Sequence, residues 1–169
     1  MKQKLTMISA LFVATILCQN MTAQKMSDQQ FVDKAAQIDM TEAHLGQLAQ
    51  EKAAAQDVKD YGRELDSDHT ANYRKLQLAA QGMNVPQGID AQHNTEINHL
   101  SKLSGAQFDR MFRQHMIQGH EQAITLFKNA STELQNQQLK SYASETLPNL
   151  QKHLEDARNL AKETKVTRR

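Results

Sequence analysis

The sequence contains few of the residues that interrupt helices, and it contains no tryptophan. Of its 169 residues, 2 are proline, 6 are glycine and 5% are aromatic. Long helices would therefore meet few breaks, and a buried core would consist mainly of leucine, alanine, isoleucine and methionine. These features favour helix-on-helix packing, within the single domain that a chain of this length usually forms.

Cysteine is also nearly absent. Cys18 is the only one, so the chain cannot form an internal disulfide. The sequence has no glycine-rich phosphate loop and no recognisable serine-triad motif. These absences leave side-chain packing as the source of stability. They also exclude the common nucleotide-binding and serine-hydrolase motifs.

Neither sign of charge is in excess. The chain has 20 lysine and arginine residues and 19 aspartate and glutamate residues. A protein that binds nucleic acid usually has excess positive charge for the phosphates and aromatic side chains for the bases. We therefore expect no nucleic acid among the partners. The last residues, 166–169, are expected to form a solvated basic tail.

Long hydrophobic runs are absent except near the N-terminus. Lys2 and Lys4 precede a mostly apolar run at residues 5–18, and small and polar residues follow it. This order is typical of a secretory signal peptide, and the run is shorter than the ~20 residues of a membrane-spanning helix. The sequence therefore predicts a signal peptide at residues 1–24, cleaved near Ala23 or Gln24, and a destination outside the cytoplasm, in the periplasm.

Other locations of the protein are also compatible with these residues. The apolar run could be a short membrane anchor, and an exported protein could also be secreted or associated with the outer membrane. Cys18 could carry a lipid, but Ile16 and Leu17 stand before it where such sites usually have small residues.

The spacing of amphipathic helices extends over residues 25–165, which we expect to form one domain. Apolar residues recur three and four positions apart, and no segment alternates with the period of a strand. Ser27 with Gln30, and Ser104 with Gln107, have the spacing of helix-capping boxes. The pattern predicts an all-α, antiparallel four-helix bundle with one short extra helix in the crossover. The expected helices span about 27–53, 57–80, 91–103, 104–130 and 137–160.

Each long helix has one polar residue on its apolar stripe. These residues are Glu42, His69, His120 and His153. Carboxylate and neutral imidazole together are ligands for Zn, Fe, Mn or Cu, and helical bundles build metal sites from facing helices. The sequence therefore indicates one transition-metal ion in the core. The alternative is a metal-free protein in which these residues only hydrogen-bond one another and act in an interaction or structural role.

The distance of each residue from the nearest turn tests this hypothesis in part. Glu42 and His69 lie at the same level, whereas His120 and His153 differ by about 7 Å at 1.5 Å per residue. His115 would match His153 better. Glu96 and His99 form one Glu-x-x-His pair, but a di-iron carboxylate site needs that pair on two helices, so such a site is not expected.

The whole stretch after the signal peptide resembles the bacterial exported family called domain of unknown function 4142. The matching residues are Phe31-Val32, Ala35-Ala36, Glu42, Leu45 to Ala49, Asp68-His69-Thr70, Asn72, Gly105, Phe108-Asp109, Met116-Ile117, His120, Leu147-Pro148, His153-Leu154 and Ala157. The resemblance implies a ferritin-like bundle and an extracytoplasmic location. It includes the same four stripe residues and not His115, and it implies no established activity.

These observations together predict a binding protein rather than an enzyme. A metal ion would be held by Glu42, His69, His120 and His153, with Asp68 orienting one imidazole ring. The expected role is in envelope stress or metal handling. The sequence indicates neither a protein partner nor an oligomeric state.

Overall fold

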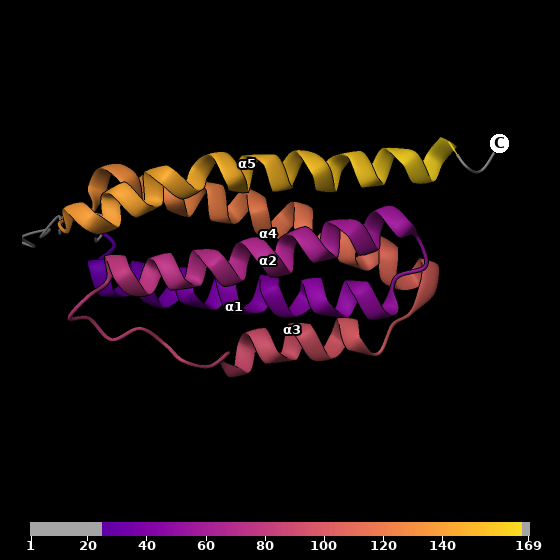
Figure 1. Cartoon of the computed structure of the whole chain (residues 1–169), viewed down its shortest axis with the longest axis horizontal. Coiled ribbons are helices and arrows are strands. Elements are labelled where there is room, and N and C mark those ends of the chain that lie inside the picture. The colour runs from indigo at the N-terminus through magenta and orange to yellow at the C-terminus, as the bar shows by residue number, and fades with distance from the viewer. Residues whose placement is uncertain (1–24, 167–169) are drawn as a thin grey trace, which may run out of the picture.

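The computed structural model describes residues 25–166, with side chains described as far as residue 160. It contains five helices and, within these residues, no strand (Figure 1): α1 (Asp28–Lys52), α2 (Gln56–Ala79), α3 (Ala91–Ser101), α4 (Gly105–Glu133) and α5 (Gln137–Val166). The prediction of an all-α helical bundle is confirmed. The predicted signal peptide, residues 1–24, lies outside the described residues.

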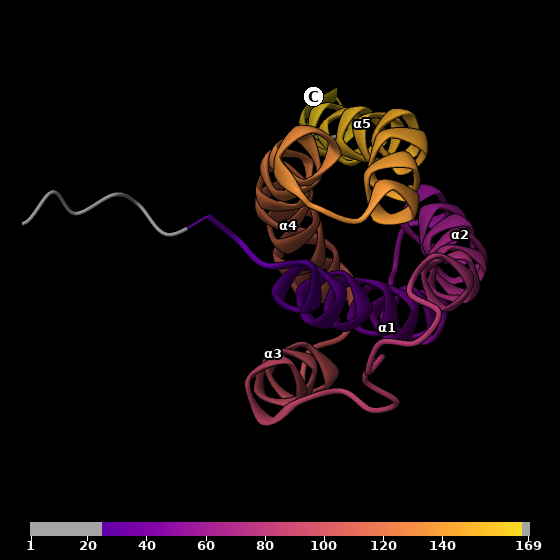
Figure 2. The ribbon, with the colours of Figure 1, turned by 90° about the vertical axis from the view of Figure 1, so that its left-hand side faces the viewer.

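The long helices form two hairpins that pack on each other. Residues 53–55 join α1 to α2, and residues 134–136 join α4 to α5. Viewed along the bundle, the four long helices surround a shared interior, and α3 lies outside it against α1 and α4 (Figure 2). The short helix therefore belongs to the crossover between the hairpins and leaves the interior to the long helices.

The start of α1 follows the predicted capping box. The Oγ of Ser27 accepts a hydrogen bond from the backbone N–H of Gln30 at 3.2 Å, and Oε1 of Gln30 accepts one from the N–H of Ser27 at 2.9 Å. The second predicted box is wrong. Ser104 does precede α4, but its side chain makes no capping hydrogen bond to the helix.

The apolar core is divided into two clusters by a polar layer. One cluster includes Phe31, Leu76 and Phe127, and the other includes Leu45 and Phe112. In α1, α2 and α4, the stripe residues Glu42, His69 and His120 fall between the segments that supply the two clusters, and His153 lies close to the same boundary in α5. Apolar packing above and below therefore holds the polar residues near the middle of the bundle.

Two glycines allow α1 and α2 to approach each other closely. A Cβ added at Gly46 would lie 2.5 Å from the carbonyl oxygen of Gly62, and one at Gly62 would lie 2.7 Å from the carbonyl oxygen of Gly46. Real Cβ atoms do not approach backbone this closely, so only glycine fits at these positions without movement. Along the hairpin, the glycine pair lies between the turn at residues 53–55 and the level of Glu42 and His69.

Each hairpin turn is bound by a carboxylate from the opposite hairpin. Asp109 of α4 accepts hydrogen bonds from the N–H groups of Ala54 and Ala55 at 3.0 and 3.1 Å. Asp28 of α1 accepts them from the N–H groups of Gln135 and Asn136 at 2.9 and 3.0 Å. Orphan backbone donors at both ends of the bundle are thereby satisfied, and the two hairpins are joined at both ends.

None of the helices within residues 25–166 combines the length and the apolar character required to cross a bilayer.

Candidate metal centre

All four stripe residues point into the interior of the bundle. Their exposed fractions are 6% for Glu42, 2% for His69, 1% for His120 and 0% for His153. Ionisable groups are rarely buried to this extent unless they are paired or bind a ligand. Their surroundings therefore decide what the site can do.

The three imidazole rings lie against one another. The ring centroid of His153 lies 5.3 Å from that of His69 and 5.3 Å from that of His120. The centroids of His69 and His120 are 5.8 Å apart. One ring nitrogen from each residue lies within 4.8 Å of the other two. Two nitrogens bound to one tetrahedral metal ion are about 3.4 Å apart, so a modest closing of the rings would bring them to bonding distance.

One nitrogen of each ring is hydrogen-bonded outward to an oxygen acceptor. Nδ1 of His69 lies 2.9 Å from Oδ1 of Asp39, and Nε2 of His153 lies 3.0 Å from Oδ2 of Asp68. Nδ1 of His120 lies 2.9 Å from the carbonyl oxygen of Met116. A carbonyl or carboxylate oxygen only accepts, so these three nitrogens carry hydrogen and donate it.

The remaining nitrogen of each ring has no partner. Nε2 of His69, Nε2 of His120 and Nδ1 of His153 are buried and have no hydrogen-bond partner among the described residues. When a ring is neutral, the hydrogen sits on its opposite nitrogen and the unpartnered nitrogen carries a lone pair; His69, whose pKa is raised, must lose one proton to present its own. In the neutral rings, three buried lone pairs belong to one converging group of imidazoles. This arrangement suits a cation.

The three histidines differ in pKa, because burial acts to lower all three values and neighbouring carboxylates oppose it to different extents. Burial, with the nearby rings of His69 and His153, lowers the pKa of His120 to about 3. Burial and His69 also lower the pKa of His153, although Asp68 opposes the shift. Burial acts to lower the pKa of His69 too, but its hydrogen bond to Asp39 and the surrounding carboxylates raise it overall.

Glu42 lies beside the three rings and does not belong to the group whose ligand atoms converge. Its Oε2 is buried without a hydrogen-bond partner among the described residues. Its Oε1 lies 3.1 Å from the position that a Cβ on Gly119, the neighbour of His120, would occupy. Burial raises the pKa of this carboxyl to about 7, and the charge of His69 partly opposes the shift. Positive charge in the centre would favour its ionised form.

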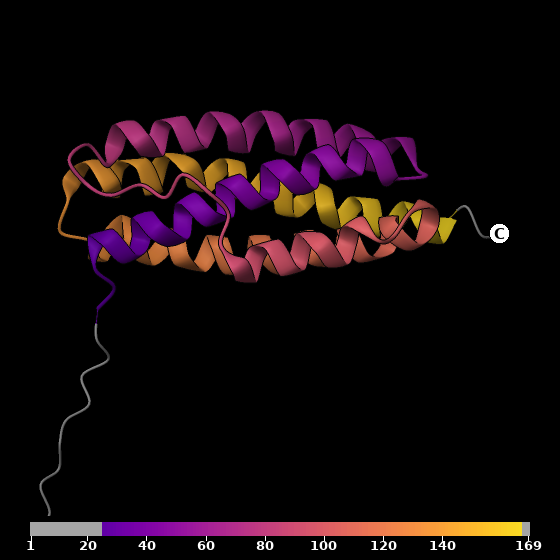
Figure 3. The same cartoon turned by 90° about the horizontal axis from the view of Figure 1, so that it is seen from below.

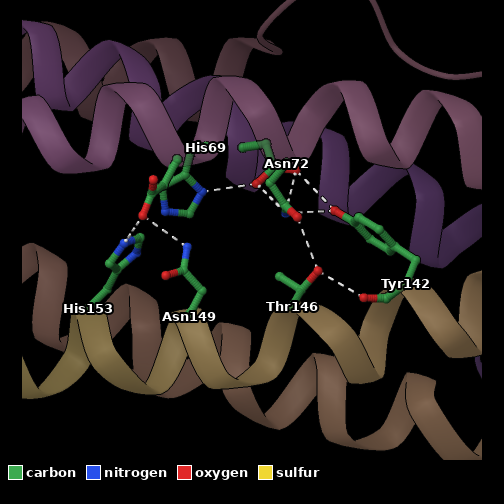
Figure 4. A network of polar contacts seen from close by, with 8 residues as sticks. His69, Asn72, Tyr142, Thr146, Asn149 and His153 are labelled. Carbon is green, nitrogen blue, oxygen red and sulfur yellow. Dashed lines mark hydrogen bonds and ion pairs between the residues drawn. The ribbon is translucent and has the colours of Figure 1, made fainter.

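Asp39 is a site residue that the sequence analysis missed. It is 1% exposed and accepts hydrogen bonds from His69, Asn72 and Tyr142. Figure 4 shows this network extending from His69 past Asn72 and Tyr142 to Thr146, whose hydroxyl donates to Oδ1 of Asn72 at 3.1 Å. The network fixes the orientation of the His69 ring.

Asp68 holds the third ring as the sequence analysis predicted. Its Oδ2 accepts from His153 and, at 3.1 Å, from the side-chain amide of Asn149. Together these hydrogen bonds outweigh the effect of burial and lower the pKa of Asp68, so it remains a carboxylate. Glu64, Asp68 and His153 also lie close together, but Glu64 pairs with Lys152 and His153 donates to Asp68, so the described partners already satisfy this group.

His115 lies outside the centre. Its side chain is 30% exposed, and its Nε2 lies 3.8 Å from Oε2 of Glu96 on α3. The level argument that favoured His115 over His120 is therefore wrong. The Cα–Cβ bond leans toward the N-terminus of its helix, so on antiparallel α4 and α5 His120 leans away from the turn and His153 toward it. This shortens the offset that Cα positions alone suggest.

Comparison with known proteins identifies a family for most of the chain. Residues 17–160 match the sequence model of a family described as Domain of unknown function (DUF4142). No curated protein and no solved structure matches the chain.

Proposed function

The chain belongs to the DUF4142 family, and we propose that it binds one divalent transition-metal ion through His69, His120 and His153. The ion would lie at the centre of a four-helix bundle of the ferritin-like type. The observation that supports this proposal is that three buried imidazoles converge and that each keeps one nitrogen without a partner among the described residues. Neutral imidazole is a ligand for Zn, Cu and Fe, and a site of mixed nitrogen and carboxylate donors also accepts Mn.

The unpaired nitrogens argue against a purely structural hydrogen-bond network. In such a network each buried nitrogen would have a partner, because an unsatisfied buried polar group costs about 1–3 kcal/mol. Here each ring is paired on its outer nitrogen only. With all three rings neutral, a single water molecule could donate to two of the three lone pairs and would leave the third unsatisfied. A metal ion accepts all three.

Each neighbouring carboxylate has a distinct role in this proposal. Asp39 and Asp68 hold the rings of His69 and His153 in the tautomer that presents a lone pair to the ion. Glu42 supplies negative charge beside the centre, and a small movement of its side chain would make it a fourth ligand. Three nitrogen ligands and one adjacent carboxylate leave room for a further ligand, as in metal sites that exchange their ion or bind a small molecule.

We further propose that the protein is an exported metal-handling protein that acts in the bacterial envelope, including under envelope stress. A binding role is favoured over catalysis because no additional nucleophile joins the described centre, and Glu42 is the one carboxyl beside it that keeps an unpartnered buried oxygen. The signal-like residues 1–24 support export. N-terminal sequencing of the protein from fractionated cells tests this part: a chain that begins near residue 24 and is recovered outside the cytoplasm is expected. A full-length chain in the cytoplasm would contradict it.

Metal binding is tested by titrating the chelator-treated protein with Zn²⁺, Co²⁺ or Cu²⁺ and by elemental analysis of the loaded protein. We expect one ion per chain for the wild type. His69→Ala, His120→Ala and His153→Ala should each weaken binding by more than about 100-fold, since each removes a ligand. His44→Ala and His99→Ala, which change exposed histidines, serve as controls and should bind as the wild type does.

The outcome separates the proposal from its structural alternative. If the wild type binds no ion tightly while the three core substitutions only lower its melting temperature, the residues are structural and the proposal is wrong. If the metal instead raises the melting temperature of the wild type but not of His120→Ala, the ion binds the folded site.

A further inference from the structure

A cleft runs along the outside of the bundle next to the candidate metal centre. It has a volume of about 820 Å³ and lies between α1, α4 and the N-terminal part of α3. Figure 3 shows these three helices on the same side of the molecule. Its charged and titratable lining residues are mainly acidic or histidine: Asp33, Glu42, Asp90, Glu96, His93 and His115. Lys34 is the one lysine in the lining. The cleft therefore favours cations over anions.

The inner wall of this cleft carries two buried polar groups that lack partners. Glu42 and Thr41 are 6% and 3% exposed, and both line the cleft. Oε2 of Glu42 and Oγ1 of Thr41 have no hydrogen-bond partner among the described residues. These unsatisfied oxygens are buried behind the wall of an acidic cleft, and a cation that passes inward from the cleft would give them a partner.

Glu42 belongs to both the cleft and the surroundings of the centre. Gly119, whose missing side chain leaves space for Oε1 of Glu42, also lines the cleft and immediately precedes His120. At the outer part of the cleft, His115 and Glu96 are 3.8 Å apart, too far for a hydrogen bond, so both keep free ligand atoms. Candidate ligands therefore occur from the outer cleft to its inner wall.

A second cleft, between α2 and α5, lacks these properties. It has a volume of about 690 Å³ and includes Asp68, Asn72, Tyr142 and Thr146. Its buried polar side chains are hydrogen-bonded to one another. Half-buried Asp68 accepts a hydrogen bond from Nε2 of His153. It offers no unpartnered buried oxygen within the described residues.

Building on the proposed function, we infer that the cleft between α1, α3 and α4 is the route by which a divalent cation reaches and leaves the three histidines. Glu96 and His115 are its first, transient ligands. Glu42 is the last carboxylate before the imidazoles. Residues on such a route change the rates of uptake and release together, because they alter the barrier, and they leave the equilibrium affinity nearly unchanged.

The test is a stopped-flow measurement of Zn²⁺ uptake by the full chain, with release followed by transfer to a fluorescent chelator. The double variant Glu96→Gln/His115→Gln is compared with Glu145→Gln/His99→Gln, which removes one exposed carboxylate and one exposed imidazole away from this cleft. We expect the first variant to slow uptake and release by about tenfold each. Its dissociation constant should stay within about twofold of the wild type. The control should match the wild type.

Salt dependence provides a second readout. Uptake by the wild type should slow as ionic strength rises, because salt screens the acidic cleft, and the cleft variant should lose most of this dependence. Unchanged rates and salt dependence in the cleft variant, with intact Zn²⁺ binding, would overturn the route and leave the proposed function standing. A large loss of affinity would also overturn it, because Glu96 and His115 would then be permanent ligands. Absence of Zn²⁺ binding in the wild type would refute both.

Discussion

At the scale of single residues, the chemistry of the centre depends on which nitrogen of each histidine carries hydrogen. Asp39, Asp68 and the Met116 carbonyl each accept from an outer nitrogen, and the inner lone pairs follow from those three contacts. None of the acceptors would contact the metal. Their effect on affinity is nevertheless large, since they orient the ligands and set their tautomers.

Asp39→Asn tests this dependence. An asparagine can turn its NH₂ group toward Nδ1 of His69 and so favour the tautomer that places hydrogen on the inner nitrogen. We expect a 10- to 100-fold loss of metal affinity, which is about the usual effect of such substitutions. The affinity is measured by competition with a chelator.

Asp66→Asn is the matched control, because Asp66 accepts its hydrogen bond from Gln47 at the surface. It should bind metal as the wild type does. Equal losses in the two variants, or none in Asp39→Asn, would show that the carboxylate at position 39 does not set the tautomer of His69.

In the metal-free protein, the contribution of Glu42 to stability should fall as pH rises from 6.5 to 8.5. Glu42 has a pKa raised to about 7, and the pKa of His69 is raised as well. A group whose pKa is raised on folding binds more protons in the folded state, so its contribution to stability is lost as pH rises through the folded pKa. His120 and His153, whose pKa values are lowered, act in the opposite direction: their contribution to stability rises with pH up to and slightly beyond the ordinary histidine value of 6.5.

Urea unfolding in the presence of a chelator measures this change, which should be on the order of 1 kcal/mol from Glu42. Glu42→Gln removes the titrating carboxyl, so the stability of the wild type minus that of this variant should fall over the window. A difference that stays constant or rises would contradict the prediction.

The sequence located the inward-facing residues but not all of their partners. Glu42 was found because it continues an apolar stripe, and Asp39 lies on that stripe too, four positions after Ala35 and three before Glu42. Ile38, one position before Asp39, also has helical spacing to Glu42, so the pattern alone does not single out Asp39. Spacing therefore identified the ligands, but it could not show which acceptor each ring would contact across the interior.

At the scale of secondary structure, the hydrophobic spacing predicted all five helices because each long helix buries one continuous face. The boundaries were within three residues of those found, since capping residues and turns mark them, except that α5 continues six residues past its expected end. The capping bond expected at Ser104 does not form. A sequence pattern gives the spacing required for such a bond, whereas the conformation of the preceding chain decides whether it is made.

Gly46→Ala should destabilise the α1–α2 hairpin. Alanine favours helix over glycine by about 1 kcal/mol, but here its Cβ would meet backbone of α2 at 2.5 Å. Overpacking of this kind costs roughly 1–3 kcal/mol, so we expect a net loss of stability in urea unfolding.

Gly88→Ala is the control, since nothing lies within 4 Å of a Cβ at Gly88. Its effect should stay within about 0.5 kcal/mol. If Gly46→Ala proved as stable as the wild type, the helices could separate at no cost and the close approach would not be required.

At the scale of the whole molecule, the two hairpins are joined at their ends by carboxylates and in the middle by the polar centre. Asp109 is 4% exposed and binds the α1–α2 turn, whereas Asp28 is more exposed and binds the α4–α5 turn. The periodic pattern alone could not predict these contacts, because they join residues more than 50 positions apart that the packing of the hairpins brings together.

Asp109→Ala should therefore cost more stability than Asp28→Ala. Because the Asp109 carboxylate is buried, its removal leaves two backbone N–H groups facing a buried space, for which we expect a loss of about 2–3 kcal/mol. Water can replace the more exposed carboxylate, so its loss should be about 1 kcal/mol. Both values come from urea unfolding. The exposed Asp60→Ala is the reference, and equal losses at positions 28 and 109 would contradict the ranking.

The division of the centre between the hairpins has a consequence for observing the molecule at work. His69 comes from one hairpin, and His120 and His153 come from the other. A cobalt ion held by all three would colour only those molecules in which the halves are docked. Its absorption would thus report the assembly of the two hairpins directly, in real time and without an added dye.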